Sequence, residues 1–312
     1  MRIAALDLGT NSFLCLIAEV SRAREFRVLH DESVIVRLGQ ELQKTGRLHP
    51  EALERARECL GQFQKTVQEL QVDRVQAVAT AAAREAENSQ EFLEICREFK
   101  IPLTTLSGEE EAKMSFRGAL DAHEKKKALL IDIGGGSTEY IVGTPERLEM
   151  SLSLPYGAVK LTERFVSQQP VRAEDEAKLR QFIRDQTESV WAQIQKLNPE
   201  KILAVAGTPT ALVAAILGGF DAEKIENYHL ADKALKSWVQ NFRQTSIEEK
   251  RNRYNLGARA DIIFAGTVIL DELLERLKAG GFHVSTKGIR YGLAYQMLDD
   301  WISGLEPSRP GH

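Results

Sequence analysis

The chain has 312 residues, a length that suits two domains of ordinary size. Hydrophobic residues make up 43% of it and charged residues 28%, a balance typical of globular proteins and not of disordered or fibrous ones. The formal net charge of −4 argues against a protein that coats nucleic acid, so a polyanionic ligand would need a local basic groove. No apolar run approaches the length of a membrane span.

The three cysteines indicate the cellular compartment. Cys15, Cys59 and Cys96 lie in apolar or helical segments, with no close cysteine pair and no Cys/His spacing for zinc. They are interpreted as reduced core residues of a cytosolic protein. The first apolar run begins directly after Met1-Arg2, which leaves no room for a signal peptide. We therefore expect a cytoplasmic protein without a membrane or nucleic-acid partner.

Strand and helix patterns alternate in the first part of the chain. The predicted strands are 3–7, 13–20, 26–38, 75–79 and 103–106, and the predicted helices are 50–70 and 91–99. Ser107, with Glu110 three residues later, has the form of a reciprocal helix N-cap, so a helix is expected to begin there. Alternation of this kind predicts an α/β layer structure.

The charged stretch 123–127, His-Glu-Lys-Lys-Lys, is the best candidate for a domain boundary. Its lysines are interpreted as a solvated linker, with a role in substrate binding as the alternative. We expect domains at 1–124 and 125–312, with the last helix able to pack back on the first domain. After this boundary the predicted strands are 128–133, 138–143, 147–154, 202–206 and 282–285, and the predicted helices are 173–197, one that opens at 207, 232–242, 246–251, 255–278 and 289–302.

Two stretches of the chain share one pattern, Ala5–Phe13 and Ile131–Tyr140. In each, an apolar run of strand length ends on an aspartate, turns through glycine into hydroxyl or amide side chains, and becomes apolar again. Glycine turns offer unhindered backbone N–H groups to phosphate oxygens, and a neighbouring carboxylate can hold a divalent cation. One Asp-x-Gly turn alone would be an ordinary hairpin connection. Three consecutive glycines and the repetition of the pattern favour a phosphate site.

These hairpins resemble the duplicated phosphate hairpins of the actin, Hsp70 and sugar-kinase superfamily. Within it, the chain most resembles the exopolyphosphatase and guanosine pentaphosphate phosphohydrolase (Ppx/GppA) family. The resemblance implies two ribonuclease-H-like (actin-like ATPase) domains with an interdomain cleft, in the short form without an added helical module. The segments that carry the resemblance follow the family order: Asp7–Ser12, Ala79–Arg84, Ser107–Ala112, Asp132–Glu139, Gly207–Thr208 and Gly288–Leu293.

The resemblance places the catalytic base at Glu110, in the motif Ser-Gly-x-Glu-Glu that opens a helix. The alternative is structural, because successive glutamates at a helix N-terminus also cap the helix and complement its dipole. Glu111 lies about 100° further around the helix and is not expected to share the role of Glu110. Glu109 is expected to cap the helix or to face solvent.

Asp132 and Glu139 flank the triglycine turn on opposite strands, and we predict catalytic and metal-binding roles for both. They would hold Mg²⁺ or Mn²⁺ directly or through waters, because such ions take oxygen ligands and retain part of their hydration shell. For Asp132 the alternative is a buried carboxylate that only caps the turn. Asp7 occupies the equivalent place in the first hairpin, where it would share the metal or position the water.

The remaining predicted site residues would contact phosphate. For Arg84 the alternative is an ordinary surface arginine. Two positions depart from the family pattern: Ala206 replaces a glycine before Gly207, and Tyr291 replaces an acidic residue, which leaves the partner of Arg290 open. The predicted phosphate contacts are Asp7, Thr10, Asn11, Ser12, Arg84, Gly134, Gly135, Gly136, Ser137, Thr138, Gly207 and Thr208.

From the resemblance we expect a hydrolase that releases terminal orthophosphate by metal-assisted attack of water. Its substrate would be inorganic polyphosphate, guanosine pentaphosphate (pppGpp), or both, and pppGpp would connect it to the stringent response. Relatives suggest a homodimer. Two alternatives remain: an ATP-dependent kinase of the same fold, and a polyphosphate or alarmone sensor that binds without turnover. The Ser-Gly-x-Glu-Glu motif favours the hydrolase over the kinase.

Overall fold

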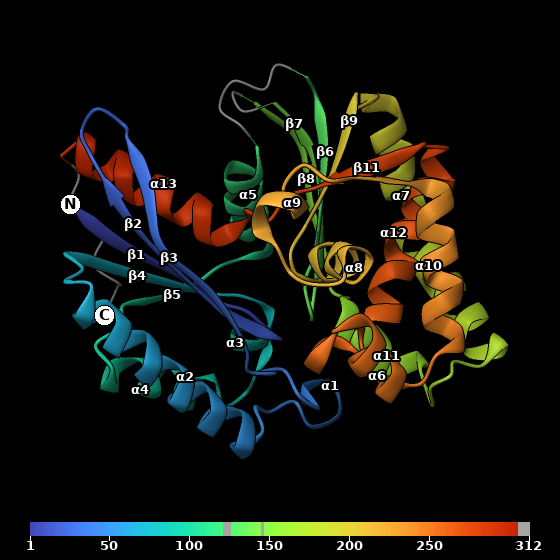
Figure 1. The fold of residues 1–312 in the computed structure, drawn as a ribbon, viewed down its shortest axis with the longest axis horizontal. Coiled ribbons are helices and arrows are strands. Elements are labelled where there is room, and N and C mark those ends of the chain that lie inside the picture. Colours follow the sequence, from blue (N-terminus) through green and yellow to red (C-terminus); the bar gives the residue numbers. More distant parts are fainter. Residues whose placement is uncertain (121–125, 145–146, 305–312) are drawn as a thin grey trace. The chain divides into compact units, whose positions relative to one another are not determined.

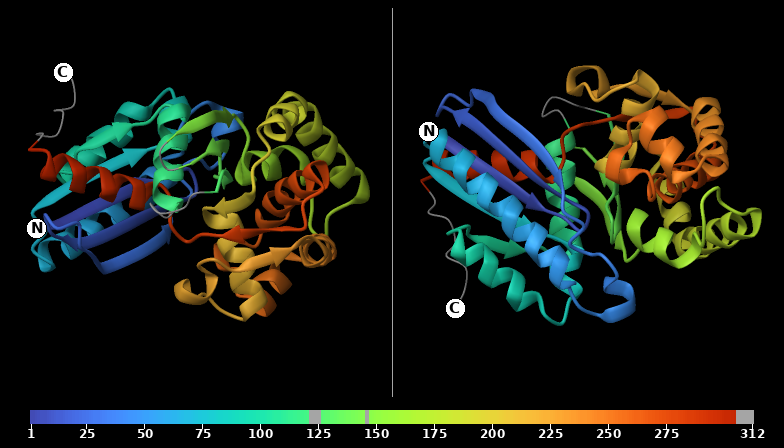
Figure 2. Two further views of the ribbon diagram at one scale, coloured as in Figure 1. Left: turned by 90° about the horizontal axis from the view of Figure 1, so that it is seen from above. Right: turned by 60° about the horizontal axis from the view of Figure 1, so that its bottom comes forward.

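The computed structural model describes residues 1–120, 126–144 and 147–304. It divides into two compact units: Met1–Gly118 together with the chain from Gly288 onward, and Ala119–Lys287. Figures 1 and 2 show the ribbon from three directions. The predicted linker at 123–127 lies mostly outside the described residues. Of its described part, Lys127 donates from Nζ to the Glu149 carboxylate and to the Leu197 carbonyl, each at 3.1 Å.

The first unit is built on a five-stranded sheet of order β3-β2-β1-β4-β5. Strands β1 and β2, and β2 and β3, are antiparallel, whereas β1 and β4, and β4 and β5, are parallel. The elements of this unit are β1 (Arg2–Leu8), β2 (Ser12–Val20), β3 (Phe26–Ile35), α1 (Leu42–Thr45), α2 (Pro50–Glu69), β4 (Arg74–Ala79), α3 (Ala81–Glu85), α4 (Ser89–Glu98), β5 (Leu103–Thr105), α5 (Gly108–Ala119) and α13 (Ile289–Ile302).

Alternation of side chains along β1 divides the core of this unit between the two faces of the sheet. Leu6 belongs to a cluster with Phe63 of α2 and residues of α4, whereas Ala5 packs with Met297 of α13. Figure 1 shows α2 and α4 on one side of the sheet and α13 on the other. Asp7 continues this alternation, so it lies on the face that α13 covers.

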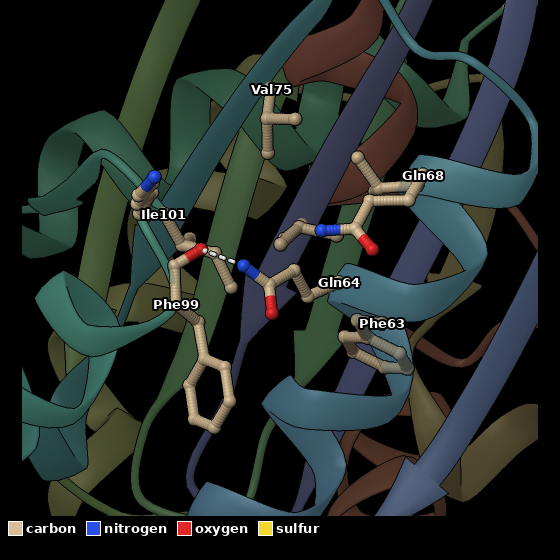
Figure 3. Close-up of a pocket in the computed structure, with 9 residues that line it drawn as sticks. Phe63, Gln64, Gln68, Val75, Phe99 and Ile101 are labelled. Carbon is tan, nitrogen blue, oxygen red and sulfur yellow. Dashed lines mark hydrogen bonds between the residues drawn. The ribbon is translucent and has the colours of Figure 1, made fainter.

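Packing on the α2 face leaves a pocket of about 150 Å³. Figure 3 shows Gln64 of α2 directed at the segment after α4, where its Nε2 donates to the Phe99 carbonyl at 3.1 Å. Leu6 reaches the pocket from the face of β1 opposite to Asp7, so the pocket is separate from the phosphate hairpin. The lining residues are Leu6, Phe63, Gln64, Val67, Gln68, Val75, Phe99, Lys100 and Ile101.

Helices α5 and α13 cross at backbone contact. A Cβ atom built on Gly118 would lie 2.0 Å from the Gly288 carbonyl oxygen, and one built on Gly292 would lie 2.0 Å from the Met114 carbonyl oxygen. Real Cβ atoms do not approach other atoms this closely. The crossing therefore depends on glycine on both helices.

Helix α13 also shows what replaces the missing acidic residue at position 291. Arg290 donates to both oxygens of Asp31 on β3, at 2.7 and 2.9 Å. The Tyr291 hydroxyl donates to the same carboxylate at 3.2 Å. Burial raises the pKa of Tyr291, which keeps this hydroxyl protonated as a donor. An acidic side chain at 291 would face Asp31 as a like charge, so Tyr291 suits a chain in which β3 provides the carboxylate.

The second unit repeats the strand order of the first. Its six-stranded sheet has the order β10-β11-β9-β6-β7-β8, and the series β8-β7-β6-β9-β11 corresponds to β3-β2-β1-β4-β5. The elements are β6 (Ala128–Ile133), β7 (Thr138–Gly143), β8 (Leu148–Leu154), α6 (Ala158–Phe165), α7 (Ala173–Leu197), β9 (Lys201–Val205), α8 (Gly207–Leu217), α9 (Ala222–Ile225), β10 (His229–Ala231), α10 (Asp232–Gln244), α11 (Ile247–Tyr254), the 3₁₀ turn η1 (Gly257–Arg259), α12 (Ile263–Leu277) and β11 (Gly281–Val284).

This repeated order confirms the predicted fold class of two α/β units. Most predicted helices and strands are also confirmed, with bounds that agree within one or two residues. The single helix predicted for 255–278 is wrong at its start, because α12 begins only at Ile263. Asn255 and Gly257 have φ of 53° and 50°, left-handed values that end α11 and open the 3₁₀ turn. No helix in the described ranges is long and apolar enough to cross a membrane.

Lys250 on α11 makes the stability of the second unit depend on pH. It is fully buried, and its Nζ donates to the Gln169 side chain and the Thr245 carbonyl. Burial lowers its pKa to about 8, whereas an unfolded lysine titrates near about 10.4. Between these values the unfolded state binds more protons, so the free energy of unfolding rises with pH, by about 1.4 kcal/mol per pH unit at most.

We expect the difference in unfolding free energy between the wild type and Lys250→Met to shift in favour of the wild type from pH 8 to 10. Urea unfolding at several pH values measures it. Lys233→Met, at an exposed position on α10, is the control and should show no such trend. A difference that stays constant with pH at Lys250 would contradict the prediction.

Candidate functional site

The first hairpin joins β1 to β2, with Asp7 at the carboxyl end of β1. The Gly9 N–H donates to the Ser12 carbonyl at 3.0 Å and closes the turn. The segment after β3 supports it from outside: Gly39 donates to the Thr10 carbonyl at 2.9 Å, and two successive N–H groups donate to the Asn11 carbonyl. The backbone carbonyls of the turn are thus occupied by protein donors.

The side chains of this turn are largely shielded from solvent. Asp7, Thr10 and Asn11 are buried, and Ser12 is half-buried. The Asn11 side-chain nitrogen is buried and finds no hydrogen-bond acceptor among the described residues. A buried donor without an acceptor is costly in a folded protein and common at ligand sites. A phosphate oxygen is an acceptor that would satisfy it.

The second hairpin joins β6 to β7. The Gly134 N–H donates to the Ser137 carbonyl at 3.1 Å, as Gly9 does in the first hairpin. Asp132 and Glu139 are direct partners in the antiparallel register, so both side chains project from the same face of the sheet. Ile131 and Tyr140 belong to the core of this unit, which places the two carboxylates on the opposite face.

Helix α6 holds the triglycine turn. Its first N–H groups donate to the turn: Ala158 to the Gly134 carbonyl at 2.9 Å, and the next residue to the Gly135 carbonyl at 3.0 Å. A Cβ atom on Gly157 would lie 2.4 Å from the Gly134 carbonyl oxygen, so only glycine allows this approach. The sequence patterns did not predict α6.

Thr138 contributes to this support. Its side chain is fully buried, and its hydroxyl donates to the Tyr156 carbonyl at 2.8 Å. The structure therefore gives that hydroxyl a partner inside the second unit, while its predicted contact with phosphate stays a prediction. Ser137 and Gly136 are also buried, and Gly134 and Gly135 are half-buried.

Asp132 and Glu139 suit a hard divalent cation. They are two carboxylates directly opposite each other on neighbouring strands, and both are almost inaccessible to solvent. Magnesium is commonly held by one or two carboxylates, with waters and substrate phosphates completing its coordination. The described residues contain no group of three or more histidine, cysteine or acidic side chains placed for a metal. The pair therefore provides two oxygen ligands of the kind that a divalent cation takes.

At the start of α5 two adjacent glutamates have opposite environments. Glu110 is exposed, and its carboxylate accepts from the Ser107 N–H and hydroxyl, both at 2.8 Å. These hydrogen bonds lower the pKa of Glu110 and form the predicted reciprocal cap. Glu111 is buried at 4% exposure, and its carboxylate pairs with Arg84 at 3.1 Å. Sequence reasoning had assigned Glu111 no role in the site.

Arg84 is held in place by this contact. Its Nη1 donates to the Leu106 carbonyl at 2.6 Å and to Glu111, and its side chain is only 29% exposed. Its backbone and side chain together are still exposed, and its predicted contact with phosphate stays a prediction. Strand β4, which precedes it, pairs in parallel with β1, and Leu8 lies beside Ala79. Arg84 thus follows the strand end next to the first hairpin.

Gly207 and Thr208 occupy the corresponding place in the second unit. Asp132 pairs with Val205 in the parallel register of β6 and β9, so α8 opens beside the second hairpin. Ala206, which departs from the family pattern, has φ of 70° and ψ of −163°. That conformation favours glycine, so an alanine at this position is strained.

Arg259 is a candidate that the sequence patterns missed. It lies in the 3₁₀ turn η1, and a Cβ atom on Gly207 would come within 1.6 Å of its Nη1. Its guanidinium is half-buried against the Gly207 backbone and makes no ion pair within the described residues. Burial lowers its pKa to about 10, so it remains a cation at neutral pH. Only the tertiary contact with Gly207 distinguishes it from other arginines.

Comparisons with known proteins agree with this arrangement. The model of the Ppx/GppA phosphatase family matches residues 16–301. This chain belongs to that family. Exopolyphosphatase 2 of Mycobacterium tuberculosis is 32% identical over 294 residues, which cover 89% of this chain and 91% of that protein.

The chain is also similar to one longer protein and to two solved structures. A bifunctional 3-dehydroquinate synthase/phosphatase of Fusobacterium nucleatum is 30% identical over 87% of this chain, which spans only 43% of that longer protein. The crystal structure of an exopolyphosphatase from Cytophaga hutchinsonii has a TM-score of 0.89 at 27% identity and covers 98% of this chain and 99% of that one. The Aquifex aeolicus Ppx/GppA structure has a TM-score of 0.77 at 28% identity, with coverage of 98% and 99%.

Proposed function

We propose that this chain is an exopolyphosphatase-type hydrolase that releases terminal orthophosphate from inorganic polyphosphate, from pppGpp, or from both. The observation that carries the proposal is the pair Asp132–Glu139 beside a triglycine turn in which α6 occupies the Gly134 and Gly135 carbonyls. Membership of a phosphatase family and similarity to proteins called exopolyphosphatases support hydrolysis and disfavour the kinase alternative.

Each hairpin would bind phosphate through polar groups of its own unit. In the second unit these are N–H groups of Gly135, Gly136 and Ser137 and the Arg259 guanidinium. In the first unit they are the Asn11 amide and the hydroxyls of Thr10 and Ser12. Hydrolysis of a phosphoanhydride depends mainly on positioning and on neutralising charge, which such groups provide.

Asp132 and Glu139 would hold Mg²⁺ or Mn²⁺. When bound, the cation neutralises negative charge on the phosphate oxygens. Asp7, at the equivalent position of the first hairpin, would orient water or share the metal. These roles match the chemistry of the donors, since carboxylate oxygens are the ligands that such cations prefer.

The carboxylate that activates water is proposed to lie at the start of α5. The family motif nominates Glu110, whose observed contacts are those of a helix cap. Glu111 is instead buried and bound to Arg84, a predicted phosphate ligand, so it lies next to a group expected to contact substrate. We therefore propose Glu111 as the stronger candidate and retain Glu110 as its rival.

The test is a side-by-side assay of orthophosphate release from polyphosphate and from pppGpp, with and without Mg²⁺. We expect metal-dependent release from at least one substrate and no ADP formed with an acceptor. Tight binding of both compounds without release would instead indicate the sensor. A homodimer, measurable by light scattering, and a cytoplasmic location belong to the same proposal. The three cysteines are buried and free, as a reducing compartment would allow.

A further inference from the structure

The register of the second sheet places a polar row across three strands. Asp132 on β6 pairs with Glu139 on β7, and Glu139 pairs with Ser153 on β8. All three side chains therefore project from the same face. The Ser153 hydroxyl donates to Oε1 of Glu139 at 2.7 Å.

A second serine on β8, Ser151, provides a comparison for the hydrogen bond that Ser153 makes. Two residues earlier on the same face of β8, Ser151 lies opposite Ile141, which in turn lies beside Leu130. The Ser151 hydroxyl is buried and finds no hydrogen-bond partner in the described parts of the chain. One of two serines on the same face thus contacts a carboxylate of the proposed metal site, and the other does not.

We propose that Ser153 is a positioning residue that fixes the Glu139 carboxylate for cation binding. This inference rests on the proposed function, in which Asp132 and Glu139 hold the metal. Glu139 is fully buried, so its charged form needs polar partners in place of water. A hydroxyl that donates to an ionised carboxylate forms one of the stronger hydrogen bonds in proteins.

The geometry also explains how the contact would act. A glutamate has rotatable bonds that would let its carboxylate turn away from Asp132. The hydrogen bond from β8 holds one oxygen, and this restricts rotation before the cation arrives. Partners that orient metal ligands in this way typically change metal affinity by about 10- to 100-fold when they are removed.

The experiment compares Ser153→Ala, Ser153→Thr and Ser151→Ala with the wild type. Mn²⁺ binding is measured without substrate, by electron paramagnetic resonance of the free ion, and the Mg²⁺ concentration for half-maximal orthophosphate release is measured separately. Ser153→Ala should weaken both by about 10- to 100-fold. Ser153→Thr, which keeps the hydroxyl, should restore them, and Ser151→Ala should leave both near the wild-type values.

Two outcomes would overturn the proposal. In the first, Ser153→Ala binds Mn²⁺ as tightly as the wild type, or the wild type binds none. In the second, Ser151→Ala causes an equal loss, which would indicate a general effect of packing on β8. Thermal unfolding without metal checks that all variants are folded. If Mn²⁺ binding follows the expected pattern but the wild type releases no orthophosphate, the proposed hydrolysis fails while the role of Ser153 stands.

Discussion

Glu111→Gln is expected to lower the rate of orthophosphate release by about 10²- to 10⁴-fold, the usual contribution of a positioned acid or base. The substitution keeps the shape of the side chain and an oxygen that accepts from Arg84, but removes the charge that would orient or deprotonate water. The expected loss is mainly in kcat, with a smaller rise in KM because Glu111 also holds Arg84, a predicted phosphate ligand. Rates measured at saturating polyphosphate and Mg²⁺ test this directly.

Glu110→Gln is the matched comparison, one residue away on the same helix. Its carboxylate accepts from the Ser107 N–H and hydroxyl, so the variant should lose about 1 kcal/mol of stability as a weakened cap and retain most activity. Glu109→Gln, which breaks only an exposed pair with Lys113, should change neither. If Glu110→Gln is inactive and Glu111→Gln is active, the catalytic base is Glu110 and not Glu111.

This pair of glutamates shows what the sequence could and could not predict. The motif located the helix start and its cap, because capping depends on residues three apart in the chain. Which of two neighbouring glutamates faces inward depends on the rotation of α5 against Leu106 and Arg84. The period of Ala112, Phe116 and Ala119 places Glu110 opposite the buried face of α5. The contact of Glu111 with Arg84 is tertiary, and no local pattern encodes it.

The same distinction holds for the second unit. Apolar runs and glycines predicted β6, β7 and β8 closely, and the duplicated Asp-Gly pattern located both hairpins. Helix α6 was not predicted because its eight residues are too few to show a clear helical period of apolar residues. Arg259 and Ser153 were not predicted for another reason. The role of Arg259 comes from its contact with Gly207, and the role of Ser153 comes from the pairing of β7 with β8. Neither contact can be inferred from the order of residues along the chain.

The crossing of α5 and α13 provides the largest expected effect on stability. In Gly118→Ala the new methyl group would overlap the Gly288 carbonyl oxygen at 2.0 Å and the Gly292 nitrogen at 2.7 Å. Both are backbone atoms, so no side-chain rotation can relieve the overlap and the helices must separate. We expect the free energy of unfolding to fall by about 3 kcal/mol, the upper range for overpacking. Urea unfolding followed by circular dichroism measures the change.

Gly61→Ala on α2 separates this effect from the ordinary preference of helices for alanine. Its Cβ atom would lie 3.4 Å from the Phe99 ring, an ordinary contact, so we expect a gain of up to about 1 kcal/mol from helix propensity. The two variants make the same chemical change inside helices of the same unit and should differ in sign. Equal effects would mean that the α5–α13 crossing can loosen at little cost, and that its glycines are not required for close packing.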